Sequence, residues 1–321
     1  MKTRTLKTLV VVVLICLVCA SLQIKTSLYR PKFQQDTVYV LVPRGASSAS
    51  VAKLLSESGI IDNPWLFKLA ARFTGLDKKL KAGEYAFSGN ISIDDVIQKM
   101  NRGDVFYRKL TIPEGLTTAQ ILTLIDNEDL LEGTISLSPK EGELLPETYS
   151  FMRGDSKDSL ITQAQKAMAA ALQNAWQTAQ DDLPLKTPQE LLILASIIEK
   201  ETGIGDERRL VASVFTNRLI KGMKLQTDPT VIYALTKGKQ ELNRALTRKD
   251  LSIDSPYNTY KYYGLPPAPI CNPGRASLEA AANPETSPYL YFVANGTGGH
   301  NFATSLKEHN TNVLSWKKSQ K

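Results

Sequence analysis

Two glutamates, Glu199 and Glu201, follow a run of apolar residues over positions 191–198 that only Ser196 interrupts. A carboxyl group at the end of a buried helix is partly desolvated, which raises its pKa and keeps it protonated near neutral pH. A protonated carboxyl group is what general acid catalysis requires. The alternative is ordinary: the helix ends here, and both glutamates face solvent together with Lys200.

The residues before this apolar run predict where its helix begins. Thr187, Pro188 and Glu190 have the order of an N-cap, a first helical residue and the third residue of a capping box. The glycines at 203 and 205 predict its end after about 14 residues.

Helical geometry separates the two glutamates. Glu199 lies one turn after Ala195 and shares its apolar face. Glu201 points about 200° away from Glu199 and lies beside the glycine break, so we expect it to be solvated. Glu199 is therefore the candidate acid.

Three polar loops follow this helix, at 225–230 (LQTDPT), 256–260 (PYNTY) and 264–267 (GLPP). They combine amide, hydroxyl and aromatic side chains, which suit a sugar because amides bond its hydroxyls and rings stack on its faces. Asp-Pro and Pro-Pro are also common in ordinary turns, so each loop alone has a second interpretation.

The composition excludes several classes of protein. Apolar residues make up 42% of the chain and charged residues 22%, which indicates a folded globular protein. The net charge of +7 is scattered and forms no basic stripe with aromatics, so we expect no nucleic acid partner. An anionic surface such as a membrane or a bacterial cell wall fits better.

The few histidines and cysteines exclude further chemistry. The body of the chain has two histidines, His300 and His309, and one cysteine, Cys271. No zinc-ligand spacing, Gly-rich phosphate loop or Gly-x-Ser-x-Gly elbow occurs there. We therefore expect neither a metal site nor a cofactor.

The N-terminus is a targeting segment. Lys2, Arg4 and Lys7 precede an apolar run over residues 9–24. We expect an uncleaved transmembrane anchor at 9–24, after a cytoplasmic tail at 1–8 and before a polar stem at 25–36; a cleaved signal peptide is the alternative. The positive charges favour an N-terminus inside the cell and a body outside.

The rest of the chain predicts an α+β fold. Residues 37–106 show the order strand, helix, helix, strand, helix, with capped helices beginning at Asn63-Pro64 and Ser92. Residues 155–240 have no strand pattern, so the second and larger domain, 107–321, is expected to be mainly helical with a loop-rich C-terminal part. Asp206 is expected to cap the helix that follows Gly205.

Nine segments together resemble one family: IPEGLT, EGELLPETY, LASIIEKET, VASVFTNRL, LQTDPTVIY, YNTY, GLPP, NPG and YLYFVANGTGGHNF. In this order they are similar to the YceG-like family of endolytic murein transglycosylases, from about Val38 to the C-terminus. The resemblance implies a single-span protein of the bacterial inner membrane with a periplasmic body. It also implies a LysM-like module at 37–106 and a YceG-like catalytic domain at 107–321. Glu147 departs from the family, which often has Asp there, and we assign it no role.

The resemblance implies an enzyme that cuts the β-1,4 bond between N-acetylmuramic acid and N-acetylglucosamine within nascent glycan strands. The family's catalytic glutamate falls on Glu199, in agreement with the burial argument. A looser similarity to goose-type lysozymes implies that Gln226, Tyr257, Asn258 and Tyr260 line the cleft. A single glutamate would protonate the leaving oxygen and then accept the proton of the C6 hydroxyl of muramic acid, which closes a 1,6-anhydro ring. Such cleavage would end glycan elongation.

Two alternatives remain open. A muramidase would use water as its nucleophile, with Glu201 or Asp228 as the second carboxylate. A non-catalytic protein would bind peptidoglycan strands through 37–106 and dock synthases through the helical domain. Synthases are also possible partners of the enzyme.

Overall fold

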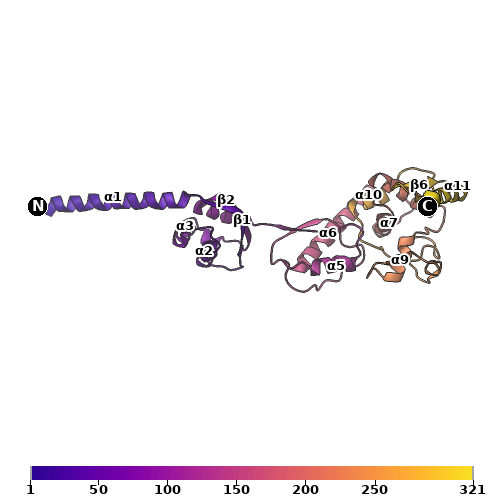
Figure 1. The fold of residues 1–321 in the computed structure, drawn as a ribbon, viewed down its shortest axis with the longest axis horizontal. Helices are drawn as coiled ribbons and strands as arrows, with labels where there is room; N and C mark the ends of the chain where they lie inside the picture. Colours follow the sequence, from indigo (N-terminus) through magenta and orange to yellow (C-terminus); the bar gives the residue numbers. More distant parts are fainter. Residues whose placement is uncertain (1, 320–321) are drawn as a thin grey trace. The chain divides into compact units, whose positions relative to one another are not determined.

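The computed structural model describes residues 2–319 and divides the chain into two compact units (Figure 1). The first unit extends to Arg108 and includes Ser150–Gly154. The second contains Lys109–Tyr149 and continues from Asp155. Each unit has its own apolar core.

The first unit begins with a long helix, α1, Lys2–Tyr29. Its part over Lys7–Tyr29 is long and apolar enough to cross a membrane. The expected stem at 25–36 contains regular structure, since α1 continues to Tyr29 and strand β1 begins at Lys32. Lys25 and Thr26 therefore belong to the helix that carries the apolar run.

After α1 the first unit has the expected order of strand, helix, helix, strand, helix. Strands β1 and β2 pair antiparallel, and the three helices supply apolar residues to one core around Phe67, Tyr85 and Phe87. Ser47, Asn63 and Ser92 cap these helices through their side-chain oxygens, as their sequence positions predict. The bounds are β1 Lys32–Val42, α2 Ser48–Glu57, α3 Pro64–Phe73, β2 Gly83–Ile91 and α4 Ile93–Arg102. The likeness of this unit to LysM stays a prediction.

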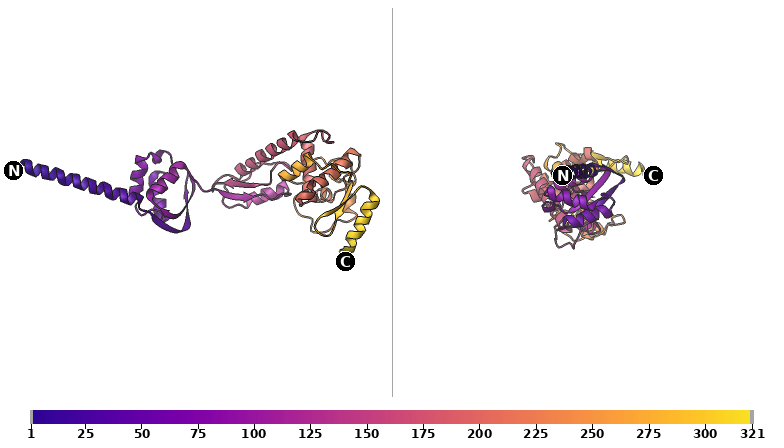
Figure 2. Two further views of the ribbon diagram at one scale, coloured as in Figure 1. Left: turned by 90° about the horizontal axis from the view of Figure 1, so that it is seen from above. Right: turned by 90° about the vertical axis from the view of Figure 1, so that its left-hand side faces the viewer.

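The second unit is mainly helical. It has seven helices of eight or more residues within the described part of the chain, and its β5–β6 hairpin packs against the last helix (Figure 2). Strands β3 and β4, which include residues of both units, form a two-stranded sheet. The bounds are β3 Arg108–Thr111, α5 Thr118–Asp126, β4 Thr148–Phe151, α6 Lys157–Gln177, α7 Pro188–Glu201, α8 Arg208–Ile220, α9 Asp228–Thr236, α10 Arg275–Ala282, β5 Tyr291–Ala294, β6 His300–Ala303 and α11 Leu306–Ser319.

Helix α7 is the central element of this unit. Every residue over positions 191–198 is buried, and the helix contacts α6, α8, α9 and α10. Ser196 is tolerated there because its hydroxyl donates to Ile193 O and accepts from Ile270 N. The prediction of a buried helix ending in two carboxylates is confirmed.

Two predicted helix starts differ in detail. Thr187 caps α7, but Glu190 accepts from the backbone N–H of Lys186 instead of closing the capping box on Thr187. Asp206 does not cap α8, because a 3₁₀ turn over Gly205–Glu207 precedes it. The residue at the N-cap, Glu207, makes no capping bond, and its carboxylate pairs with His300 instead.

The C-terminal part is less loop-like than its sequence suggested. The segment QTDPTVIYAL contains helix α9, whose first turn holds Asp228 and Pro229. The last described residues form α11, which packs on β5 and β6. Helices α9 and α11 both supply side chains to one cavity: Asp228 from α9, and Leu306 and His309 from α11.

Candidate active site

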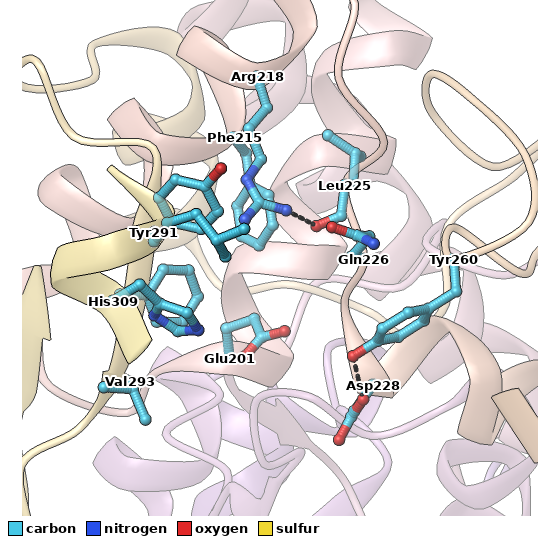
Figure 3. A pocket seen from close by; sticks show the side chains of 12 residues that line it. Glu201, Phe215, Arg218, Leu225, Gln226, Asp228, Tyr260, Tyr291, Val293 and His309 are labelled. Carbon is cyan, nitrogen blue, oxygen red and sulfur yellow. Dashed lines mark hydrogen bonds between the residues drawn. The ribbon is translucent and has the colours of Figure 1, made fainter. Parts of the chain in front are cut away.

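A cavity of about 420 Å³ lies in the second unit at the C-terminal end of α7 (Figure 3). Residues from α8, from the segment leading into α9, from β5 and from α11 complete its wall. Its apolar lining is Phe215, Leu225, Phe292, Val293 and Leu306, and its polar lining is Glu201, Arg218, Gln226, Asp228, Tyr260, Tyr291 and His309.

Glu201, the last residue of α7, carries the carboxyl group of this cavity. Burial raises the pKa of Glu201; a hydrogen bond from the Thr227 hydroxyl opposes this, and the neighbouring charge of Asp228 adds to it. His300 and Arg218 lower this pKa by smaller amounts. Glu201 is half-buried and shares the cavity with the segment before α9 and with β5, so the expectation that it is simply solvated is wrong.

A chain of buried threonines fixes the partner of Glu201. The backbone N–H of Thr227 donates to Thr259 Oγ1 (3.1 Å), and Thr230 Oγ1 donates to Thr227 O (2.7 Å). Thr230 and Thr259 are joined through their hydroxyls at 2.8 Å. All three residues are buried, so Thr227 holds one oxygen of the Glu201 carboxyl group in a set position.

A second carboxylate, Asp228, lies in the first turn of α9, where the helix dipole favours negative charge. The Tyr260 hydroxyl donates to Asp228 Oδ1 at 2.6 Å. Burial and this hydrogen bond raise the pKa of Tyr260, so it remains a neutral donor. The two carboxyl groups thus have different surroundings within one cavity: Glu201 is desolvated, and Asp228 is exposed and hydrogen-bonded.

The opposite wall combines a cation with two stacked rings. Arg218 donates through Nε to Leu290 O (2.7 Å) and through Nη1 to Leu225 O (2.8 Å), and its guanidinium lies 5.0 Å from the ring centre of Tyr291. His309 stacks on Tyr291 at 5.3 Å. Burial, with Arg218 adding to it, lowers the pKa of His309, so the imidazole is neutral at physiological pH.

Two of the predicted cleft residues, Gln226 and Tyr260, line the cavity with Glu201. Gln226 is exposed and has a φ of 50°, a left-handed conformation that is uncommon for a residue with a side chain. Such backbone strain often marks a functional position.

Asn258, the fourth predicted cleft residue, is not part of the lining of this cavity. Asn258 is fully buried, and its amide donates to Leu251 O (3.0 Å) and Ile253 O (2.9 Å). Its Oδ1 accepts from the backbone N–H of Tyr260 (3.0 Å). Because all of these bonds are internal, Asn258 shapes the loop that carries Tyr260.

Tyr257 is not part of the lining of this cavity. Its ring packs 4.9 Å from that of Tyr233, whose hydroxyl donates to Glu141. Burial is the largest cause that raises the pKa of Glu141. The predicted role of Tyr257 in substrate binding stays a prediction.

Glu199 faces a different part of the second unit. Its Oε2 accepts from the backbone N–H of Gly274, the N-cap of α10, at 2.8 Å. The carboxyl group of Glu114 lies against the same glycine, so close that a Cβ there would be 1.8 Å from Glu114 Oε1. Glu199 thus anchors the start of α10 and does not line the cavity.

The different surroundings of Glu199 and Glu201 could not be predicted from the sequence, because α7 is buried on all faces over residues 191–198. An apolar face identified Glu199, but such a face does not reveal which side of a buried helix borders a cavity. Thr227, Arg218 and His309 were also missed, since the elements that bring them to Glu201 are distant in sequence. One signal was present: Thr227 and Asp228 stand beside Gln226 in the polar LQTDPT loop.

Comparison with known proteins agrees with the sequence motifs. The model of the YceG-like family matches residues 40–315. The chain belongs to the YceG-like family. The family assignment expected from the nine sequence segments is therefore confirmed.

Several relatives of this YceG-like chain carry the name endolytic murein transglycosylase. That of Bacillus subtilis (strain 168) is 34% identical over 313 residues, covering 87% of this chain and 84% of the relative. That of Streptococcus pneumoniae serotype 2 (strain D39) is 30% identical over 322 residues and covers 86% of this chain, which spans 58% of the pneumococcal protein. A crystal structure of a YceG-like protein from Listeria monocytogenes is 36% identical, with a TM-score of 0.52, covering 87% of this chain and 99% of that one.

Proposed function

We propose that this YceG-like protein is a lytic transglycosylase that cuts β-1,4 bonds between N-acetylmuramic acid and N-acetylglucosamine within peptidoglycan strands. Its relatives named endolytic murein transglycosylase support the substrate class. The observation that carries the chemistry is the half-buried carboxyl group of Glu201, whose pKa burial raises, in a cavity that also presents Gln226 and Tyr260.

In the first step Glu201 acts as the general acid. Burial raises its pKa and so favours the protonated form, which donates its proton to the glycosidic oxygen as the bond from that oxygen to C1 of muramic acid breaks. Thr227 holds one carboxyl oxygen, which leaves the other for the substrate. The leaving sugar departs with a hydroxyl group, and positive charge develops on C1.

In the second step the carboxylate of Glu201 acts as the base. It accepts the proton of the C6 hydroxyl of the same muramic acid while the C6 oxygen bonds to C1 and closes a 1,6-anhydro ring. The proton lost in the first step is regained, and no water is consumed. Because the nucleophile belongs to the same sugar ring, its approach has a small entropic cost.

Asp228 has a supporting role in this scheme. Its carboxylate, held by Tyr260, borders the cavity and would stabilise the positive charge on C1 by electrostatic attraction. The same pair of carboxyl groups also suits the second candidate function, a hydrolytic muramidase, in which Asp228 would assist an incoming water. The products distinguish the two.

The location follows from α1. We propose that α1 anchors the protein in the bacterial inner membrane with its N-terminus inside and its body in the periplasm, beside nascent strands. Cleavage there would end glycan elongation, and peptidoglycan synthases are the proposed partners.

Product analysis by mass spectrometry tests the proposal. The full chain in detergent is incubated with purified glycan strands, beside the Glu201→Gln variant. We expect anhydro-muramic ends from the native protein and none from the variant. Reducing ends, heavier by one water, would mean a muramidase. Strands left uncut by both proteins but bound by both would indicate a scaffold.

A further inference from the structure

A second cavity, of about 490 Å³, lies at the other end of α7. The segment before α7 and the first turns of that helix form one side, and the loop with Pro266 and Pro267 forms the other. We call it the proline cavity. Nothing in the proposed reaction uses it.

The proline cavity presents polar groups that have no protein partner among the described residues. These are the ammonium group of Lys186 and the side-chain amide of Gln189, both on exposed residues. The carboxylate of Glu190, in contrast, already accepts from the backbone N–H of Lys186. The site therefore offers donors to a ligand but no unpaired carboxylate.

An aromatic ring stands at the same cavity. Tyr263 is 71% exposed, and the ammonium group of Lys224 lies 5.0 Å from its ring centre. Leu219, Leu265 and the two prolines supply apolar walls. Sugars combine apolar ring faces with many hydroxyls, so a ring beside free amide and ammonium donors is a chemical match.

One short segment joins this cavity to the site of Glu201. Gln226 and Leu225 line the Glu201 cavity, and the next residue, Lys224, contacts Tyr263 of the proline cavity. Along α7, Ile193 at the proline cavity is eight residues before Glu201, which corresponds to about 12 Å of helix axis.

We propose that the proline cavity binds sugar residues of the glycan strand whose bond is cut at Glu201, several units away from that bond. This proposal rests on the proposed function and extends it. An enzyme that cuts within strands must hold the polymer beyond the reacting sugars, and binding energy from such remote contacts is available for catalysis. Tyr263 stacks on a ring, and Gln189 and Lys186 donate to its hydroxyls.

Kinetics on two substrate lengths test this inference. The variants are Tyr263→Ala and Gln189→Ala, both at exposed positions where folding should be preserved. The matched control is Tyr262→Ala, at the next exposed tyrosine, whose hydroxyl donates to Asp254 and which is not part of the cavity lining. The substrates are long peptide-free strands and a peptide-free tetrasaccharide.

We expect Tyr263→Ala to raise KM for long strands about five- to tenfold and to leave the tetrasaccharide unaffected. Equal effects on both lengths, or no effect on either, would overturn the proposal. An effect found only when strands carry their peptides would assign the cavity to the peptide instead and would also overturn it.

A binding measurement separates this inference from the reaction mechanism. Long strands are titrated against the Glu201→Gln chain with and without Tyr263→Ala, so that no turnover is needed. Weaker binding with Tyr263→Ala, by a similar five- to tenfold, supports the subsite even if the native protein yields reducing ends. Unchanged binding overturns it, whatever the products are.

Discussion

Glu199 and Glu201 end the same helix in two different environments. Glu199 bonds the backbone N–H of Gly274 and holds the start of α10. Glu201 lies in a cavity, where burial raises its pKa and Thr227 bonds it through a side chain. We propose from this difference that Glu199 positions α10 and that Glu201 transfers the proton.

The comparison also shows how one helix serves both purposes. Helix α7 is buried over residues 191–198, and Glu199 fixes its last turn through the backbone N–H of Gly274. The position of Glu201 then needs no support from the substrate. The bond between Glu199 and Gly274 thus helps to fix the position of Glu201 in the cavity.

The largest expected effect is that of Glu201→Gln. The amide cannot donate a proton to the glycosidic oxygen, so turnover should fall by about 10³-fold, within the usual range for a general acid. The rate of anhydro-muramic product formation is the measurement. A variant that retains more than a tenth of native activity would show that Glu201 is not the general acid.

A smaller effect is expected for Thr227→Val. The Thr227 hydroxyl donates to the carboxylate and so favours the ionised form of Glu201. Its loss should lower turnover about tenfold through poorer positioning and raise the pKa of Glu201 further, so the alkaline limb of kcat/KM should move to higher pH.

Thr227→Ser is the matched control because it keeps the hydroxyl group. It should restore most of the activity and the native pH profile. A Val variant with reduced activity but an unshifted profile would show that Thr227 only supports the fold.

Stability should depend on pH through Glu201. Its pKa is raised above the unfolded value near 4.5, so the folded state binds the proton more tightly. This contribution to stability is fully present below that value and is lost as pH rises through the folded pKa.

Glu114 and Glu141 have raised pKa values as well, so the native protein alone is not diagnostic. The unfolding temperature of Glu201→Gln should therefore rise relative to that of the native protein from pH 4 to pH 8, because the glutamine does not titrate. A difference that stays constant over this range would contradict the desolvation of Glu201.

The smallest effect is expected on the Gly274 side. A Cβ in Gly274→Ala would displace the flexible end of Glu114, while the backbone N–H that Glu199 accepts remains. Stability should fall by about 1 kcal/mol, or roughly 2–4 °C, and activity should change less than twofold. A large loss of activity at normal stability would mean that this side takes part in catalysis.

Much of the scaffold could be predicted from local sequence. The caps at Asn63 and Ser92 and the Thr187-Pro188 start of α7 each use bonds between neighbours in the chain, which a sequence displays directly. The nine family segments likewise predicted the correct family.

The site could be predicted only in part. Gln226 and Tyr260 could be predicted because they lie in polar loops. Asn258 lies in the same kind of loop, but its side chain forms only internal hydrogen bonds. The assignment between Glu199 and Glu201 depends on what packs against each face of α7. Those neighbours, Gly274 on one side and Thr227 on the other, are 75 and 26 residues away in the chain.

The most direct test of the distinction between the glutamates is the activity of Glu199→Gln, the variant that the sequence pattern alone predicts to be inactive. The full chain carrying this change is given purified glycan strands, and the rate of anhydro-muramic product is compared with that of the native protein. If Glu199 serves to hold the start of α10, as we propose, activity should stay within about tenfold of native and the unfolding temperature should fall. Loss of product to the level of Glu201→Gln, in a variant that remains folded, would contradict the account and assign the acid to Glu199.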